Sequence, residues 1–412
     1  MLNRCVSTDP DTFAAEYWGR RPLLSRSGEL PRDFDDLLSP AAVDELIAER
    51  GVRAPFIRLA RDGELLARDC YLGPGGFGAE VPDQVDSAKV LDAFAAGATI
   101  VLQGLHRLWP PLVAFVRDAV DELGHPVQTN AYITPPDSRG FESHYDVHDV
   151  FVLQVAGRKR WVVHEPVHPH PLPTQPWTQH RARIGERVAG ADPVIDAVLS
   201  PGDTLYLPRG WLHSARALEG TAIHLTVGVA PVTGLDVARA VVDQLATVEG
   251  FRQSLPMGTA PVDRDEAAAT VTKVMAQIVE QLRDDAAGLG AGAAERLTRR
   301  HAERTRPDGI RPLAALEAAE HAGTVTVRWR PGLAATVDAT ADRVVLRLPD
   351  RVMTFPAVCG GAVEALQRGL VGDAATMPGL DRADATVLIR RLLREAVVVP
   401  AGAPQPAARP AG

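Results

Sequence analysis

The 412-residue chain is poor in cysteine: Cys5, Cys70 and Cys359 are odd in number and far apart. A disulfide scaffold needs paired cysteines, so this class is excluded and a reducing compartment is expected. No apolar run reaches the ~20 residues that a membrane-spanning helix requires, and the first residues lack the apolar stretch of a signal peptide. The sequence therefore predicts a cytoplasmic protein without a membrane segment.

Positive charge is also in short supply, because 44 Lys and Arg residues stand against 52 Asp and Glu residues, giving a net charge of -8. A general nucleic-acid binder carries a basic surface, so we expect no direct nucleic-acid binding. An acidic protein instead attracts basic partners over long range.

The most informative motif is His144-x-Asp146, which is followed much later by His213. Side chains two residues apart on a strand leave the same face, so His144 and Asp146 could reach one ion from a strand. Two imidazoles and one carboxylate leave other coordination positions free, and this is the ligand set of non-haem Fe(II) oxygenases. An isolated His-x-Asp is frequent by chance, so a cupin-like site that binds metal without turnover stays open.

The surrounding sequence predicts short strands separated by turns. Pro135, Pro136 and Gly140 break the chain before the motif, and a turn at Gly157 joins two strand-like runs that are expected to pair consecutively. The expected strands are residues 99–103, 127–134, 149–155, 160–164, 204–207 and 221–229. Such a pattern is typical of a small barrel or jelly roll.

Four sequence blocks together resemble the JmjC-type ribosomal oxygenases. They are Asn130-Ala-Tyr-Ile-Thr-Pro-Pro, His144-x-Asp146-x-x-Asp149-x-Phe151, Gln154-x-x-Gly157-x-Lys159-x-Trp161 and Pro201-Gly-Asp-x-Leu-Tyr-x-Pro. The N-terminal Phe13-x-x-x-Tyr17-Trp18 and the C-terminal third are similar to the same family. The likeness therefore covers most of the chain.

The resemblance implies roles for seven residues. His144, Asp146 and His213 would bind Fe(II), and Lys159 would bind the distal carboxylate of 2-oxoglutarate, a task that suits an ammonium group. The resemblance also implies that the co-substrate pocket is lined by Tyr132, Asn130 and, less directly, Thr134. Dioxygen would be the second co-substrate.

Simpler interpretations of single residues stay open. Lys159 could be a solvated charge in a basic run, Tyr132 a core aromatic, and Asn130 a partner for a backbone group. His148 is a possible pocket residue, and His224 is expected in the core or behind the site. A further cluster, His164, His168 and His170, is threaded with prolines and is interpreted as a surface loop rather than a zinc site.

The predicted fold class is α+β, with a double-stranded β-helix core over 127–230 inside a JmjC-type catalytic domain over 1–233. Residues 234–306 are expected to be helical and, by resemblance, to form a homodimer. Residues 307–400 resemble a winged-helix domain, and the tail 401–412 is expected to be disordered. Helices are expected at 11–19, 39–50, 86–95, 108–122, 234–245, 263–283, 355–368 and 381–394, and C-terminal strands at 325–330, 343–348 and 396–399.

By resemblance, the chain is expected to be a dioxygenase dependent on Fe(II) and 2-oxoglutarate that hydroxylates an arginine or histidine side chain of a basic ribosomal protein. The same chemistry on a biosynthetic peptide or small molecule is one alternative. A catalytically silent cupin-like protein that binds metal or a partner is the other.

Overall fold

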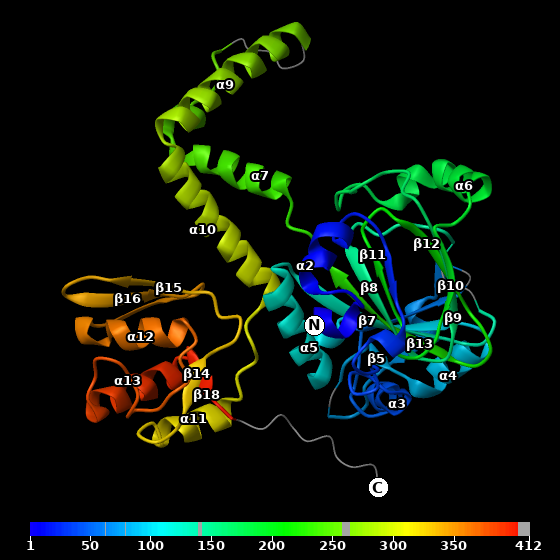
Figure 1. Cartoon of the computed structure of the whole chain (residues 1–412), viewed down its shortest axis with the longest axis horizontal. Coiled ribbons are helices and arrows are strands. Elements are labelled where there is room, and N and C mark those ends of the chain that lie inside the picture. Colours follow the sequence, from blue (N-terminus) through cyan, green and yellow to red (C-terminus); the bar gives the residue numbers. More distant parts are fainter. Residues whose placement is uncertain (62, 79, 139–141, 258–263, 403–412) are drawn as a thin grey trace. The chain divides into compact units, whose positions relative to one another are not determined.

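The computed structural model describes residues 1–61, 63–78, 80–138, 142–257 and 264–402. The chain forms two compact units, Met1–Pro231 and Val232–Gly412 (Figure 1). Within these described ranges, no helix has both the length and the apolar character needed to cross a bilayer.

The first unit is built on two antiparallel sheets. The larger sheet has eight strands in the order β1-β11-β8-β13-β7-β6-β2-β3, and the smaller has three in the order β10-β9-β12. The strands of the larger sheet are β1 Leu23–Ser25, β2 Ile57–Arg61, β3 Glu64–Leu65, β6 Thr99–Leu102, β7 Val127–Thr134, β8 Asp149–Ala156, β11 Thr204–Leu207 and β13 Ala222–Val229. Those of the smaller sheet are β9 Lys159–His164, β10 Ile195–Leu199 and β12 Leu212–Ala217, and a short ribbon pairs β4 Leu72–Gly73 with β5 Gln84–Val85. The predicted α+β class with a jelly-roll core is confirmed.

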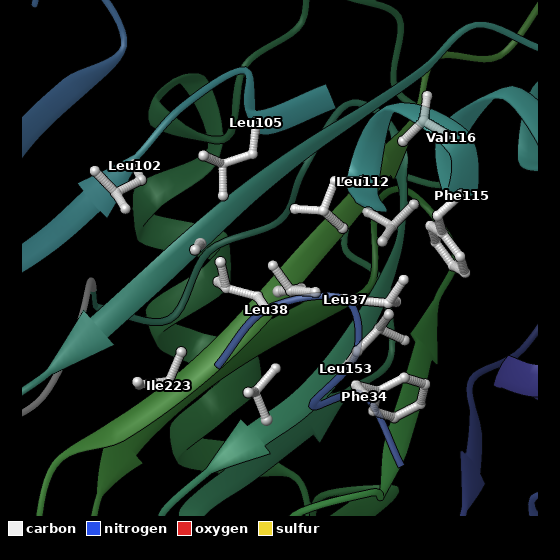
Figure 2. Packing of buried hydrophobic residues seen from close by; sticks show 14 of the residues in the cluster. Phe34, Leu37, Leu38, Leu102, Leu105, Leu112, Phe115, Val116, Leu153 and Ile223 are labelled. Atoms are coloured by element: carbon white, nitrogen blue, oxygen red, sulfur yellow. The ribbon is translucent and has the colours of Figure 1, made fainter. Parts of the chain in front are cut away.

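Successive side chains of a strand point to opposite faces of a sheet. One face of the larger sheet therefore packs in the core, and the other faces a cavity. One face buries apolar residues such as Leu102, Leu153 and Ile223 in the main core. Figure 2 shows these side chains in one cluster with Leu112 and Phe115 of the helix α5. The opposite face lines a cavity between the two sheets, described below.

Helices cover the first unit and close its ends. They are α1 Leu2–Cys5, α2 Pro10–Thr12, α3 Pro40–Ala48, α4 Ser87–Ala95, α5 Pro110–Leu123 and α6 Arg181–Gly190. The longest of them, α5, begins with Pro110, whose missing N–H costs nothing in the first turn, and ends before Gly124, which has a φ of 69°. The predicted helix 11–19 is only a short α-turn followed by a π-turn over Phe13–Tyr17.

Two sequence-based expectations in this unit are wrong. The strands on either side of Gly157 do not pair consecutively: β8 pairs with β11 and β13, whereas β9 pairs with β10 and β12. Gly157 has a φ of 62°, and a Cβ atom there would lie 2.3 Å from the carbonyl oxygen of Thr221. This tight left-handed turn, packed against the neighbouring loop, carries the chain from one sheet to the other.

The second error concerns the metal motif, which does not lie on a regular strand. His144 makes an isolated bridge to His213, and Asp146 lies in the loop before β8. In the described residues 142–148, this bridge is the one strand-like pairing before β8 begins at Asp149.

The second unit contains a helical segment and a small mixed domain. Its helices are α7 Gly234–Gln244, α8 Glu249–Arg252, α9 Arg264–Asp284, α10 Ala286–Thr305, α11 Pro312–Glu320, α12 Gly360–Gln367 and α13 Arg382–Arg394. Its strands are β14 Val327–Trp329, β15 Thr336–Ala339, β16 Arg343–Arg347, β17 Val352–Pro356 and β18 Val398–Pro400. The meander β15-β16-β17 and the pair β14-β18 share an apolar core with α12 and α13.

Several elements of this unit were not anticipated. The predicted helix over 355–368 is wrong at its start, because β17 runs to Pro356 and α12 begins at Gly360. The helix α10 lies within 234–306, which was expected to be helical, whereas α11 was not expected, since its alanine-rich sequence lacks a clear apolar period. The boundaries at 233, 306 and 400 and the winged-helix-like assignment stay predictions. The tail expected to be disordered lies outside the described residues from 403 onward, and so does residue 263 of the expected helix 263–283.

Candidate metal centre and co-substrate pocket

The structure brings His144, Asp146 and His213 together at the mouth of the jelly roll. One ligand atom from each lies within 4.8 Å of the others. The Nε2 atom of His213 is 3.6 Å from a carboxylate oxygen of Asp146, and the two imidazole rings are 4.5 Å apart. In the described part of the chain, this is the one group of three or more such side chains close enough to share an ion.

Main-chain contacts fix the two histidines relative to each other. The N–H of His144 donates to the carbonyl of His213 at 3.1 Å, and the N–H of His213 donates back at 2.8 Å. The Nδ1 atom of His144 lies 2.8 Å from the carbonyl of Glu142, and that of His213 lies 3.1 Å from the carbonyl of Trp211. A carbonyl can only accept a hydrogen bond, so each Nδ1 carries the proton and each Nε2 keeps its lone pair for the shared position.

The loop between β11 and β12 holds the third ligand. The N–H of Gly210 donates to the carbonyl of Asp146 at 3.0 Å. Gly210 has a φ of 89°, and a Cβ atom there would lie 2.8 Å from the carbonyl oxygen of His168. Next to it, the N–H of Arg209 donates to the buried carboxylate of Asp149 at 2.7 Å. Asp149 therefore anchors this loop and does not belong to the ligand group.

The protonation states suit a divalent cation. Burial raises the pKa of Asp146, but His148, His213 and His144 together more than offset this, and the net pKa is lowered. Burial and the neighbouring His144 lower the pKa of His213 to about 4. At neutral pH the site thus offers an ionised carboxylate and a neutral imidazole, the forms that bind metals.

A cavity of about 240 Å³ leads from this group into the space between the two sheets. Its walls carry few charges, and most of its lining comes from the inner faces of the strands. The lining includes Arg58, Thr99, Val101, Tyr132, Thr134, Val150, Val152, Lys159, Trp161, Trp177, His224 and Thr226, in addition to the three possible ligands.

Lys159 is buried in this cavity, with only 4% of its surface exposed. Its Nζ donates to the hydroxyl of Thr134 at 2.8 Å and lies 3.1 Å from Nδ1 of His224. Burial lowers the pKa of Lys159 to about 7. A buried ammonium without a carboxylate partner is costly, so the position favours an anionic ligand.

Tyr132 and His224 form the wall beside Lys159. Their rings stack at 5.0 Å with an angle of 5° between the planes. Burial, and then the carboxylate of Asp146, raise the pKa of Tyr132, and burial and Lys159 lower that of His224. Both rings are therefore neutral at physiological pH.

Of the other residues singled out in the sequence, Thr134 lines the cavity and Asn130 does not. The side-chain oxygen of Asn130 accepts a hydrogen bond from the N–H of Gly104 at 3.0 Å, which matches the simpler interpretation of this residue. His148 packs against Gly228, where a Cβ atom would lie 2.7 Å from its ring. His164 belongs to β9 and is buried, so only His168 and His170 lie in the proline-rich loop.

Sequence reasoning missed many of the strand residues that line the cavity, and among the missed residues are two with large side chains, Arg58 and Trp177. Arg58 lies on β2, far from the motif blocks in sequence. The Trp177 ring is 5.9 Å from that of His144 and is covered by the guanidinium of Arg181 at 4.9 Å. No local pattern marked either residue, because strand pairing and a long loop bring them to the site.

Comparison with known proteins finds a JmjC domain around the possible metal ligands. A JmjC domain matches residues 112–237. The chain is 29% identical to human ribosomal oxygenase 1 over 219 residues, which cover 53% of this chain and 32% of that protein. It is 41% identical over 102 residues to a bifunctional lysine-specific demethylase and histidyl-hydroxylase NO66 from Drosophila persimilis, covering 24% of this chain and 14% of that protein. The chain thus spans about a third or less of the length of these curated relatives.

The fold is similar to that of solved structures. The ribosomal oxygenase YcfD of Escherichia coli matches with a TM-score of 0.56 at 18% identity, covering 96% of this chain and 99% of that one. A YcfD structure in complex with cobalt and 2-oxoglutarate matches with a TM-score of 0.53 at 18% identity, covering 96% of this chain and 98% of that one. Residues 112–237 thus contain a JmjC domain, and the solved structures show a similar fold over almost the whole chain.

Proposed function

We propose that this protein is an Fe(II)- and 2-oxoglutarate-dependent dioxygenase that hydroxylates an arginine or histidine side chain of a ribosomal protein. The observation that carries the proposal is the presence of two complementary features in one cavity. One is the His144, Asp146 and His213 group, and the other is the buried ammonium of Lys159.

The donor set fits the proposed metal. Two imidazole nitrogens and one carboxylate oxygen suit Fe(II) and leave positions free for a chelating co-substrate and dioxygen. When bound, iron would activate dioxygen, which is the oxidant, and 2-oxoglutarate would supply two electrons: one oxygen atom would enter the C–H bond and the other succinate, with release of carbon dioxide. The backbone bridge between His144 and His213 supports this assignment, since it holds two of the donors in place without metal.

The remaining residues would bind and orient the co-substrate. We infer that Lys159 pairs with the distal carboxylate of 2-oxoglutarate, while Thr134 and His224 hold its ammonium in position. The Tyr132 ring, buried and neutral, would shield this ion pair from water and strengthen it. Trp177 at the mouth would limit access to the metal from solvent.

The direct test is anaerobic reconstitution with Fe(II), followed by oxygen-dependent conversion of 2-oxoglutarate to succinate with and without ribosomal proteins of the same organism. Mass spectrometry would look for one added oxygen on an arginine or histidine. Stimulated turnover with that adduct is the expected result. Turnover without an adduct would favour a small-molecule or peptide substrate, and no turnover with a loaded metal would favour a silent binding protein.

We also propose that the protein acts in the cytoplasm as a homodimer that contacts a basic ribosomal partner. The helix α9 supports the dimer, because none of its residues is buried and Val271, Met275 and Val279 are 55%, 60% and 47% exposed. Residues four apart form one stripe along a helix, and such a stripe would be covered in a helix-to-helix contact. The net charge of -8 supports a basic partner.

A further inference from the structure

Four paired strands carry a row of side chains across the pocket face of the larger sheet. In the register of the sheet, Arg58 of β2 lies opposite Val101 of β6, Val101 opposite Tyr132 of β7, and Tyr132 opposite His224 of β13. All four residues line the cavity. Lys159 contacts the His224 end of this row, and Arg58 forms the other end. The row therefore separates two cations within one pocket.

Arg58 has unused hydrogen-bonding capacity. Its Nε atom is buried without a hydrogen-bond partner. A hydrogen bond from its side chain to Tyr132 and its positive charge both lower the pKa of that tyrosine, against the larger effect of burial. Among the residues that the structure describes, no carboxylate is in ion-pair distance of Arg58. A buried donor without a partner is unfavourable, so a ligand with an acceptor atom would be stabilised here.

Two acidic groups that the structure describes at the pocket and its ligand loop are already engaged. Asp146 is the one carboxylate among the lining residues that the structure describes, and the metal would take it. Glu142, next to the ligand loop, pairs with Arg181 at 2.9 Å. Among the described lining residues, a cationic side chain entering this pocket would therefore meet Arg58 with no carboxylate other than the metal ligand Asp146 to balance its charge.

We propose that Arg58 is a specificity-determining residue that selects a neutral substrate side chain with a hydrogen-bond acceptor and excludes a cationic one. Of the two side chains considered above, this selects the imidazole of histidine over the guanidinium of arginine. The inference rests on the proposed function. Arg58 would donate to the acceptor nitrogen of the substrate ring, and the Tyr132 hydroxyl oxygen would accept from the N–H of that ring.

The test uses matched peptides that differ only in a central histidine or arginine, placed in the sequence around the residue that the wild-type protein modifies. Selectivity is the ratio of kcat/KM for the histidine peptide to kcat/KM for the arginine peptide. We expect the wild-type protein to favour histidine. Arg58→Gln should lower kcat/KM for the histidine peptide by about tenfold to a hundredfold, the effect of losing a hydrogen bond from a charged donor. Arg58→Glu should shift selectivity toward arginine by creating an attractive carboxylate.

Arg61→Gln is the matched control, because Arg61 is an exposed arginine on the same strand and is not among the lining residues. This control should keep wild-type selectivity. Thermal unfolding of each variant checks the fold, and Arg58→Lys, which keeps the charge but not the planar donors, should still exclude arginine.

A wild-type protein that favours the arginine peptide would overturn the role of Arg58. So would an Arg58→Gln variant that raises the KM for 2-oxoglutarate while its peptide selectivity is unchanged, since Arg58 would then bind the co-substrate. Wild-type protein that forms no succinate under any condition would overturn the proposed function itself, and the role of Arg58 with it.

Discussion

The main chains of His144 and His213 are joined by two reciprocal hydrogen bonds, at 3.1 and 2.8 Å. These residues lie far apart in sequence and on different segments, yet their backbones are held together independently of their imidazoles. The geometry of two donors is therefore fixed by the fold, and a metal ion would not need to assemble it.

The first prediction follows from this separation of backbone and side chain. His144→Ala should lower metal affinity by at least about a hundredfold. Loss of a residue that only hydrogen-bonds to a ligand already costs up to about a hundredfold, and loss of the ligand itself should cost more. The melting temperature of the metal-free protein should change little, because the bridge to His213 needs only the main chain. Calorimetric titration with Co(II) and a thermal melt check both points. Unchanged metal affinity or turnover would exclude His144 as a ligand.

The second prediction concerns pH and Lys159, whose pKa is lowered to about 7 by burial. A bound dicarboxylate would raise this pKa, so the complex would hold more protons than the free protein above pH 7. Affinity for 2-oxoglutarate should therefore fall as pH rises from 7, by up to about tenfold per pH unit. Titrations of the protein with 2-oxoglutarate at several pH values, in the presence of a redox-inactive metal, would measure this affinity.

Lys159→Arg is the control for this pH effect, because a guanidinium stays charged throughout the range. It should flatten the dependence, and Lys159→Ala should chiefly raise the 2-oxoglutarate requirement. A wild-type affinity that does not vary above pH 7, or an unaltered requirement in Lys159→Ala, would remove Lys159 from the co-substrate site.

The third prediction tests the loop that holds Asp146. Gly210→Ala places a Cβ 2.8 Å from the carbonyl oxygen of His168 at a φ of 89°, so the loop must shift. Metal affinity should fall about tenfold or more, in line with the loss of a group that positions a ligand. Gly220→Ala is the matched control, since its φ is 77° and nothing lies within 4 Å. It should cost only about 1 kcal/mol of stability and leave metal affinity unchanged.

The fourth prediction tests the exposed stripe of α9. Changing Val271 and Met275 together to Glu should convert a dimer into a monomer, because two charges would be buried in the contact. Light scattering coupled to size-exclusion chromatography measures the mass. Gln277→Glu, on the opposite side of the helix, should leave the mass unchanged. A wild-type protein that is monomeric at high concentration would contradict the proposed dimer.

The sequence allowed the jelly roll and the family to be predicted because both depend on local signals. The strand over 127–134 was predicted with its observed bounds, since β-branched and apolar residues alternate with polar residues along most of it before Pro135. The JmjC part of the resemblance is confirmed by a domain match that covers the ligand motif. The grouping of His144, Asp146 and His213 was also anticipated, although their role in catalysis stays a prediction.

What could not be predicted depends on the path of the chain between distant segments. Gly157 marked a turn, but no sequence feature said that the turn crosses to the other sheet. Arg58 and Trp177 reach the cavity through strand order and a long loop, and neither has a local signature. The sequence also did not predict α6, β10 and β12, which lie between residues 181 and 217. Prolines and short apolar runs there obscure the helical or strand periodicity.

Side chains along β2 alternate between the apolar core and the pocket, so the register of this strand determines both. Ile57 and Leu59 fill the core while Arg58 and Ala60 face the cavity, so a slip of one residue would exchange the two sets. A misregistered strand would bury a guanidinium among aliphatic side chains, which folding strongly disfavours. Natural selection for a stable protein therefore also preserves the charge of the pocket, and mutations that loosen this strand should be detected first as lost substrate discrimination.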